Sequence, residues 1–259
     1  VITTVKNGEL FVLETLKSVK NQTFKNFEHI IVDDGSTDNT VNIIKKFQGN
    51  HPNYKLHLFQ PGSLGRGRAL NYAISKAKSD WIAIIDGDDL WHPHKLDLQY
   101  NYIKTNKFDV LATKTQLFER TENVNFEKKN ELNTLVCFKK KQLLKSNEIS
   151  HSSVLIRKEL CRYDENRESQ FDYELWLRLI SNKKELVLLT NVLNYHRIHS
   201  NQSFESKMGR AYSWRAYKLN ILYALKFGET SFVFYSSAKF LLRMVFSKKQ
   251  LKVLKSKLK

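Results

Sequence analysis

Several features that mark large classes of proteins are scarce or missing in this sequence. Its 259 residues include only two cysteines, Cys137 and Cys161, without the spacing of metal ligands, so we expect buried reduced thiols in a cytosolic protein. No segment resembles a signal peptide. No Gly-x-Gly-x-x-Gly follows the first apolar run and no P-loop motif occurs, which argues against dinucleotide-binding enzymes and NTPases. The chain opens on Val1 rather than Met, and we expect the natural protein to begin a few residues earlier.

Negative charge is the scarcer of the two signs, and the excess of positive charge is unevenly spread. The sequence holds 43 Lys and Arg residues against 26 Asp and Glu residues, for a formal net charge of +17. From Ser206 to Lys259 there are 13 basic residues and one acid, Glu229, so residues 1–205 carry a net charge of only +5. Hydrophobic residues make up 41% of the chain, which argues against intrinsic disorder. The basicity is therefore chiefly a property of the C-terminal segment.

Residues 206–259 are predicted to form a basic, amphipathic, helical tail. Lys239 and Arg243 interrupt its apolar runs, so no segment reaches the length of a clean transmembrane helix. Apolar residues then alternate with the lysines 248, 249, 252, 255, 257 and 259. This pattern is typical of a helix on an anionic bilayer, and we expect peripheral membrane contact through residues 230–259. A solvated basic helix, or a helix packed on the rest of the chain, would show the same pattern.

Strand-like and helix-like segments alternate through the first 110 residues. The predicted strands are 1–5, 27–32, 55–59 and 81–85, and the predicted helices are 10–21, 37–47 and 66–78. This alternation indicates βαβ units and a mostly parallel sheet flanked by helices. In such sheets, ligands bind at the carboxyl ends of the strands.

Acidic residues follow two of these predicted strands. Asp33 and Asp34 come after the second strand, and Asp86, Asp88 and Asp89 come after the fourth. Carboxylate oxygens are preferred ligands of Mg²⁺ and Mn²⁺, so a divalent-cation site is one interpretation, and a solvated acidic loop is the simpler one. The segment after Asp34 also suits a turn, with Ser36 and Thr37 capping the next helix.

Five blocks of sequence, in order, resemble the signature of the family 2 glycosyltransferases. They are residues 1–8, residues 15–23, residues 31–38 with Asp33-Asp34-Gly35-Ser36, residues 65–71 with Gly65-Arg66-Gly67-Arg68, and the run Ile84-Ile85-Asp86-Gly87-Asp88-Asp89. The resemblance covers residues 1–205 and implies an α/β protein with a GT-A (Rossmann-like) fold, extended by the helical tail at residues 206–259. It divides the catalytic domain into a nucleotide-sugar half at about residues 1–112 and an acceptor half at about residues 113–205.

The resemblance also implies roles for individual residues. The nucleotide sugar would be bound by Thr4, Asp33, Asp34, Arg66, Arg68, Asp86 and Asp89. Asp33 or Asp34 would accept from the base, Asp86 would contact the ribose, and Arg66 would neutralise the diphosphate. Asp88 and His199 would hold Mn²⁺ or Mg²⁺, whereas a lone histidine such as His196 is more often structural.

The predicted catalytic base lies in the stretch Gln170-Phe171-Asp172-Tyr173-Glu174-Leu175-Trp176. The resemblance places Asp172 at the family's base, although Phe171 stands where the family often has Glu. A helix N-terminus, where an acid is stabilised by the helix dipole, would also explain Asp172. As base, Asp172 would take the proton from an acceptor hydroxyl while that oxygen attacks the anomeric carbon, which inverts the centre in one step.

The predicted function is a metal-dependent inverting glycosyltransferase. It would transfer a sugar from a nucleoside-diphosphate sugar, with UDP favoured, to a glycan or lipid-linked acceptor, in the cytoplasm at the inner face of the cell membrane. A metal-dependent nucleotidyltransferase is the nearest alternative enzyme. A nucleic-acid-binding module would explain the charge but not the acidic clusters, which would repel phosphates, so we expect no nucleic acid partner. A non-catalytic lectin-like or scaffold protein is a further alternative.

Overall fold

The computed structural model describes residues 1–126, 134–199 and 209–245, and these fall into two compact units. Unit 1 consists of residues 1–138 and 148–198, and unit 2 of residues 139–147 and 199–259. The predicted domain boundary at residue 205 lies outside the described residues. One short internal segment, residues 139–147, groups with the C-terminal helices, which the sequence did not indicate.

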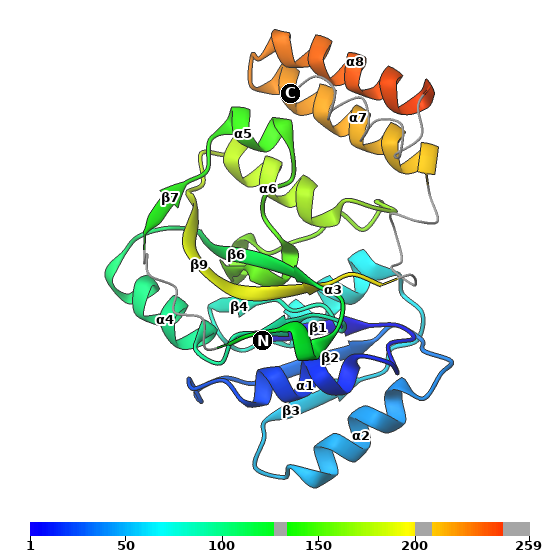
Figure 1. Ribbon diagram of the computed structural model, residues 1–259, viewed down its shortest axis with the longest axis vertical. Helices are drawn as coiled ribbons and strands as arrows, with labels where there is room; N and C mark the ends of the chain where they lie inside the picture. The colour runs from blue at the N-terminus through cyan, green and yellow to red at the C-terminus, as the bar shows by residue number, and fades with distance from the viewer. Residues whose placement is uncertain (127–133, 200–208, 246–259) are drawn as a thin grey trace. The chain divides into compact units, whose positions relative to one another are not determined.

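Unit 1 begins with three parallel strands in the order β1-β2-β3 (Figure 1). The strands are β1 (Ile2–Val5), β2 (His29–Asp33) and β3 (Leu56–Phe59), and the helices between them are α1 (Val12–Lys20) and α2 (Thr40–Asn50). β1 and β2 are buried along their whole length, which is why neither shows the strict apolar and polar alternation of a strand with one exposed face. The predicted alternation is confirmed here.

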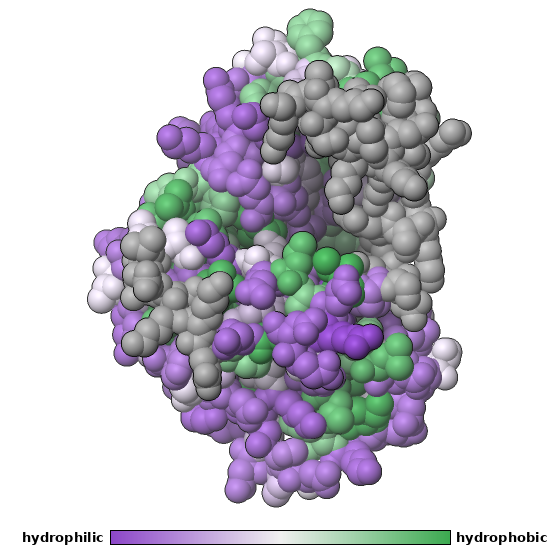
Figure 2. All heavy atoms as spheres, in the orientation of Figure 1, coloured by the Kyte–Doolittle hydropathy of each residue, from purple (hydrophilic) through white to green (hydrophobic). Residues whose placement is uncertain are grey.

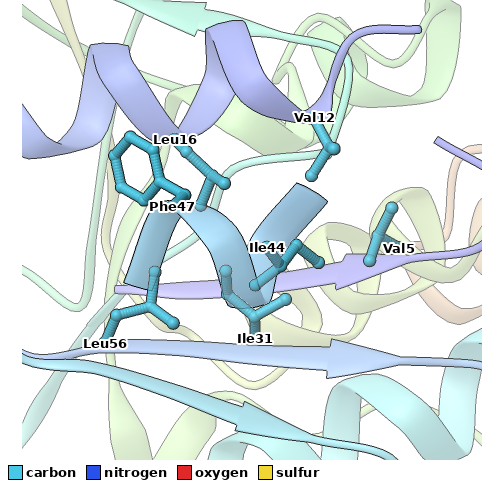
Figure 3. Packing of buried hydrophobic residues seen from close by; sticks show 7 residues of the cluster. All are labelled: Val5, Val12, Leu16, Ile31, Ile44, Phe47 and Leu56. Carbon is cyan, nitrogen blue, oxygen red and sulfur yellow. The ribbon is translucent and has the colours of Figure 1, made fainter. Parts of the chain in front are cut away.

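The core of this half lies between the sheet and the two helices. Figure 3 shows the side chains that fill it: Val5, Val12, Leu16, Ile31, Ile44, Phe47 and Leu56. All are at most 6% exposed, and α1 and α2 supply their members at helical spacing. Burial of these side chains fixes both helices on one face of the sheet.

α2 starts three residues later than predicted. Ser36 Oγ accepts a hydrogen bond from the backbone N–H of Asn7, and the N–H of Thr37 donates to the Asn7 side chain. The prediction that Ser36 and Thr37 cap α2 is therefore wrong, because their polar groups bind the loop after β1. Asp38 accepts instead from the N–H of Thr40, the first residue of α2.

The chain next returns across the sheet to the other side of β1. α3 (Arg66–Lys76) packs on β1 and β2, and right-handed crossovers place it on the face opposite α1 and α2. β4 (Trp81–Ala83) follows, and Ile84 forms a parallel bridge with Ile2. The acidic run that starts at Asp86 therefore emerges beside the end of β1.

The second half of unit 1 is a mixed sheet of order β4-β8-β6-β9-β5, with β7 also paired to β9. Its further strands are β5 (Leu90–Trp91), β6 (Val110–Phe118), β7 (Leu135–Cys137), β8 (Leu155–Arg157) and β9 (Leu186–Arg197). Of its pairings only β6 with β9 is parallel, so the predicted parallel arrangement applies to the first half. The connecting elements are α4 (Lys95–Thr105), η1 (Thr121–Asn123), η2 (His151–Ser153), η3 (Lys158–Leu160) and α6 (Phe171–Ser181).

Both cysteines are free thiols, but only Cys161 is buried. Burial raises the pKa of the Cys161 thiol to about 12, so it stays protonated and unreactive. The expectation of two buried thiols is wrong for Cys137, which is exposed because it ends the edge strand β7.

Unit 2 is helical. α7 (Gly209–Lys226) and α8 (Thr230–Val245) form a hairpin, and α5 (Lys140–Lys145) packs against α7. The aromatic rings of Trp214 and Tyr217 on α7 contact Phe240 on α8. Within the described residues, no helix is long and apolar enough to cross a membrane.

Candidate active site

The site lies at the carboxyl ends of β1 and β2, together with the segment that follows β4. Parallel strands bring these ends to one edge of the sheet, so residues that follow each strand become neighbours. Asp33 ends β2, Asp34 comes next, and the run from Asp86 to Asp89 follows Ile85, whose N–H donates to Ile2 of β1. Thr4, another predicted nucleotide ligand, is buried in β1 beside Val32.

The two adjacent acids after β2 have different environments. Oδ2 of Asp33 accepts the backbone N–H of Ser36 at 3.0 Å, while its Oδ1 is buried and has no hydrogen-bond partner among the described residues. Oδ1 of Asp34 instead accepts from the backbone N–H groups of Leu64 and Gly65, at 2.6 and 2.9 Å. Asp34 thus holds the loop that enters α3, whereas Asp33 has one buried oxygen that no donor of the described residues reaches.

This loop places Arg66 at the start of α3. Gly65, the residue before the helix, has φ of 86°, a conformation that favours glycine. Nη2 of Arg66 donates to Oδ1 of Asp86 at 2.7 Å. Arg68 instead forms a 3.7 Å ion pair with Glu165 in which both side chains are exposed. Two residues apart on a helix, Arg66 and Arg68 point in divergent directions, so only Arg66 meets the acidic run.

The charged side chains of the site strongly affect one another's pKa values. Burial alone would lower the pKa of the Arg66 guanidinium, but Asp86, Asp172 and Asp88 outweigh it and raise that pKa above its ordinary value. Burial alone would raise the pKa of the Asp86 carboxyl, but Arg66 and His151 hold it well below the usual range. Asp86 is therefore an anion and Arg66 a cation at any working pH.

The acidic run itself divides into partly and fully buried members. Asp88 is partly buried, and its carbonyl oxygen accepts from Nε of Arg197 at 2.9 Å. The Asp89 side chain is fully buried, and its Oδ1 lies 3.0 Å from both Nδ1 of His196 and the backbone nitrogen of Arg197. These contacts of Asp89 join the acidic run to the end of β9.

The pair of Asp89 and His196 predicts a pH-dependent stability. The hydrogen bond to Asp89 raises the pKa of His196 to about 9, against the lowering effect of burial. Because this pKa exceeds the unfolded value of about 6.5, the stabilisation is complete below pH 6.5 and is lost as pH rises through 9. His196 is 37% exposed, so screening limits the effect to roughly 1 kcal/mol.

We expect His196→Asn, which keeps a neutral donor, to lower the free energy of unfolding at pH 6 but hardly at pH 10. Urea unfolding of both proteins across this range measures the difference. His57→Asn is the matched control, because the His57 side chain is 49% exposed and its ring lies 3.7 Å from Glu28. If the difference in the free energy of unfolding between His196→Asn and the wild type does not change with pH, His196 does not form an ion pair with Asp89.

The predicted base, Asp172, lies in the first turn of α6, and its charge acts on Arg66. Gln170 precedes α6 with φ of 56°, in the left-handed region. Phe171 is 6% exposed and packs on α3: a Cβ added to Gly67 would lie 2.8 Å from its ring. The residue that departs from the family pattern thus fastens the start of α6 to the start of α3, which keeps Asp172 near Arg66.

His199 follows β9 and is assigned to unit 2, so its predicted role as a metal ligand stays a prediction. Over the described ranges, no group of three or more His, Cys, Asp or Glu residues is arranged to hold a metal ion. Sites for Mg²⁺ in nucleotide-using enzymes commonly combine one or two carboxylates with phosphate oxygens of the substrate. The chemistry of Asp88 beside a diphosphate fits that pattern.

The sequence interpretation missed three residues of the site. His151 bonds Asp86, Tyr163 bonds His151, and Arg197 bonds the backbone of Asp88. Arg197 lies two residues before the motif histidine His199, a signal that could have drawn attention to it. No short-range signal marks His151 or Tyr163, because their contacts form only when η2 and the loop after η3 pack close to Asp86.

Comparison with known proteins supports a common origin for this arrangement. A family model described as "Glycosyl transferase family 2" matches residues 1–162. An uncharacterized glycosyltransferase of Methanocaldococcus jannaschii is 28% identical over 85% of this chain and 77% of its own length. The O-antigen biosynthesis glycosyltransferase WbnJ of Escherichia coli is 27% identical over 80% of this chain and 82% of its own length.

Solved structures share the fold. S. aureus TarS in complex with UDP-GlcNAc superposes with a TM-score of 0.70 and 20% identity, covering 96% of this chain and 73% of that one. The mannosyltransferase PcManGT of Pyrobaculum calidifontis, in complex with GDP-Man and Mn²⁺, superposes with a TM-score of 0.62 and 15% identity. The match covers 99% of this chain and 78% of that one.

Proposed function

Because this chain belongs to glycosyl transferase family 2 and has the GT-A fold, we propose that it transfers a sugar from a nucleoside-diphosphate sugar, with UDP as our first choice of nucleotide, to a glycan or lipid-linked acceptor. The acceptor would belong to a surface polysaccharide or glycoconjugate pathway. The observation that carries the proposal is the presence at one sheet edge of a buried acceptor at Asp33 and the Arg66–Asp86 pair, with the charge of Asp172 close enough to act on Arg66. Nucleotide, sugar phosphate and acceptor each need one of these groups.

Each group has a distinct task in this proposal. Oδ1 of Asp33 accepts a hydrogen bond from the base, since a buried acceptor without a partner favours a ligand that donates. Asp86 accepts from a ribose hydroxyl, and Arg66 stabilises the diphosphate as negative charge develops on it. Asp88 would hold Mn²⁺ or Mg²⁺, which when bound helps to neutralise the leaving diphosphate.

Asp172 carries the chemical step. Its carboxylate takes the proton from the acceptor hydroxyl as that oxygen attacks the anomeric carbon, and the bond to the diphosphate breaks. One displacement inverts the anomeric centre and needs no protein nucleophile. Arg66 lies close enough to both Asp86 and Asp172 for each charge to raise its pKa, so one cation links the donor side and the acceptor side.

The test is a binding and hydrolysis screen of nucleotide sugars with Mn²⁺ present. The panel should include UDP and GDP sugars, because one structural neighbour was solved with UDP-GlcNAc and another with GDP-Man. We expect the sugars of one nucleotide class to bind, and we expect their slow hydrolysis to release a nucleoside diphosphate. Release of pyrophosphate would indicate a nucleotidyltransferase, and absence of any binding would refute the proposal.

Unit 2 is our proposed membrane-contacting part. α8 exposes large apolar side chains, among them Phe234 at 77% and Leu241 at 62%, which lie seven residues apart and so on one face. Figure 2 shows hydrophobic side chains at the surface over this hairpin. Lys239 on α8 and Lys218 and Lys226 on α7 add positive charge. The lysines beyond residue 246 that first indicated membrane contact lie outside the described residues.

We expect the double substitution Phe234→Ser with Leu241→Ser to weaken binding to phosphatidylserine vesicles by roughly tenfold or more, because each apolar side chain loses a transfer free energy of about 1.5–3 kcal/mol. Vesicle sedimentation measures this. Leu117→Ser is the matched control, since Leu117 is 61% exposed but lies on β6 of unit 1. Equal binding by the double variant and the wild type would refute the membrane proposal.

A further inference from the structure

The carboxylate of Asp86 is held through one of its two oxygens. Oδ1 accepts from Nη2 of Arg66 at 2.7 Å and lies 3.1 Å from Nδ1 of His151. Because an ionised carboxylate can only accept, Nδ1 of His151 carries the proton and donates it. Both side-chain donors therefore converge on Oδ1, and neither of these hydrogen bonds involves Oδ2.

His151 is fixed in turn by a buried tyrosine. Its Nε2 lies 2.7 Å from the hydroxyl of Tyr163, and the two side chains belong to residues that are 7% and 2% exposed. The backbone of Tyr163 is bonded twice to the side chain of Asn71, at 2.9 Å in both directions. Asn71 and Arg66 lie on the same helix, α3, so a closed ring of contacts runs from Arg66 through Asp86, His151, Tyr163 and Asn71 back to α3.

The segment that carries His151 also holds the backbone of Asp86. The N–H of Asp86 donates to Oγ of Ser152 at 3.0 Å, and the carbonyl of Ser152 accepts from Nε1 of Trp91 at 2.7 Å. Trp91 is buried in β5, which anchors η2 to the mixed sheet. Residues 151 and 152 thus bind both the side chain and the main chain of Asp86 and leave its carboxylate little freedom to rotate.

We propose that His151, supported by Tyr163, is a positioning residue for nucleotide binding. It orients Asp86 so that Oδ2 meets a ribose hydroxyl of the nucleotide and Arg66 stays aimed at the diphosphate. A single bond from Arg66 would let the carboxylate rotate about its last torsion angle, whereas two converging donors fix its plane. This inference rests on the proposed function, because it assigns the support of the same nucleotide site.

The experiment measures the binding of UDP and GDP, with Mn²⁺, by titration calorimetry. His151→Gln keeps an amide that reaches Tyr163 but has no donor at the Nδ1 position, so we expect the dissociation constant to rise about tenfold, the scale of a lost hydrogen bond to a charged group. His151→Asn places an amide N–H near the Nδ1 position, and we expect it to bind within about threefold of the wild type. The two variants are a matched pair because both carry an amide group, which lies near Tyr163 in His151→Gln and near the Nδ1 position in His151→Asn.

A double-mutant cycle separates positioning from general stability. In an Asp86→Ala background, His151→Gln should cause no further loss of affinity, because the group it orients is gone. His29→Asn is the structural control: His29 is fully buried and bonded to Thr3 and Tyr54, at 2.9 and 2.8 Å, in the first sheet. It should lower the melting temperature without changing the dissociation constant.

Four results would overturn the inference. Wild-type affinity in His151→Gln would show that Asp86 needs no second donor. Equal losses in His151→Gln and His151→Asn, or additive losses in the cycle, would show that His151 acts by supporting the fold. If the wild type binds neither UDP nor GDP, the proposed function fails and the inference with it, whereas the other outcomes arise only in a protein that binds a nucleotide.

Discussion

Replacing Asp172 by Asn is expected to lower the turnover of sugar transfer by about a hundredfold or more, the scale for the loss of a general base. Asparagine keeps the size of the side chain but cannot accept the proton of the acceptor hydroxyl. Asp172 lies in the first turn of α6, close enough to Arg66 for its charge to raise the pKa of the guanidinium. Donor affinity should change little, because Arg66 keeps its bond to Asp86.

Steady-state and single-turnover rates with a verified acceptor measure this effect. Glu174→Gln is the matched control, because Glu174 lies in the same turn but accepts from Nε of Arg178 at 3.0 Å. Near wild-type turnover in Asp172→Asn would place the base elsewhere: at Glu174 if the Glu174→Gln variant has lost turnover, and otherwise Glu168 is the next residue to test. A loss of turnover caused only by a loss of donor binding would make Asp172 a binding residue.

Replacing Asp88 by Ala is expected to abolish the dependence of nucleotide binding on Mn²⁺, with at least about a hundredfold loss of affinity in its presence. Even residues behind a metal ligand typically change metal affinity by 10–100-fold, and Asp88 is proposed to bind the ion itself. Its carbonyl is held by Nε of Arg197 at 2.9 Å, so the main chain of the loop should survive the substitution. An unchanged melting temperature would show this.

Calorimetry with and without Mn²⁺ measures the effect on binding. Asp97→Ala removes a partly buried carboxylate from the first turn of α4 and should leave the Mn²⁺ dependence intact. An unchanged affinity of Asp88→Ala in Mn²⁺ would refute the metal assignment. Loss of binding in the absence of the metal as well would instead indicate direct contact between Asp88 and the nucleotide.

Local pattern was enough to predict the first half of the fold. Periodicity of two or of 3.6 residues depends only on near neighbours, and the helix predicted at 66–78 is observed as Arg66–Lys76. The pattern failed where partners are distant: α2 begins late because Ser36 and Thr37 bond to Asn7, which lies about 30 residues away. No local pattern predicts how the strands of the mixed sheet, β4 through β9, pair with one another, because their partners are also distant in the sequence.

By itself the sequence determined that acids follow two of the predicted strands, that a basic residue stands at the start of α3, and that the order of blocks identifies the family. Only the tertiary structure decided how these residues share the work. It gives Asp34 to the loop and leaves Asp33 an open acceptor, turns Arg66 but not Arg68 to the acids, and buries Asp89 against His196, which lies 107 residues away. It also brings His151 to Asp86 across 65 residues. These roles depend on hydrogen bonds between segments that meet only in the packed protein, where each buried polar group must find a partner and the packing decides which one.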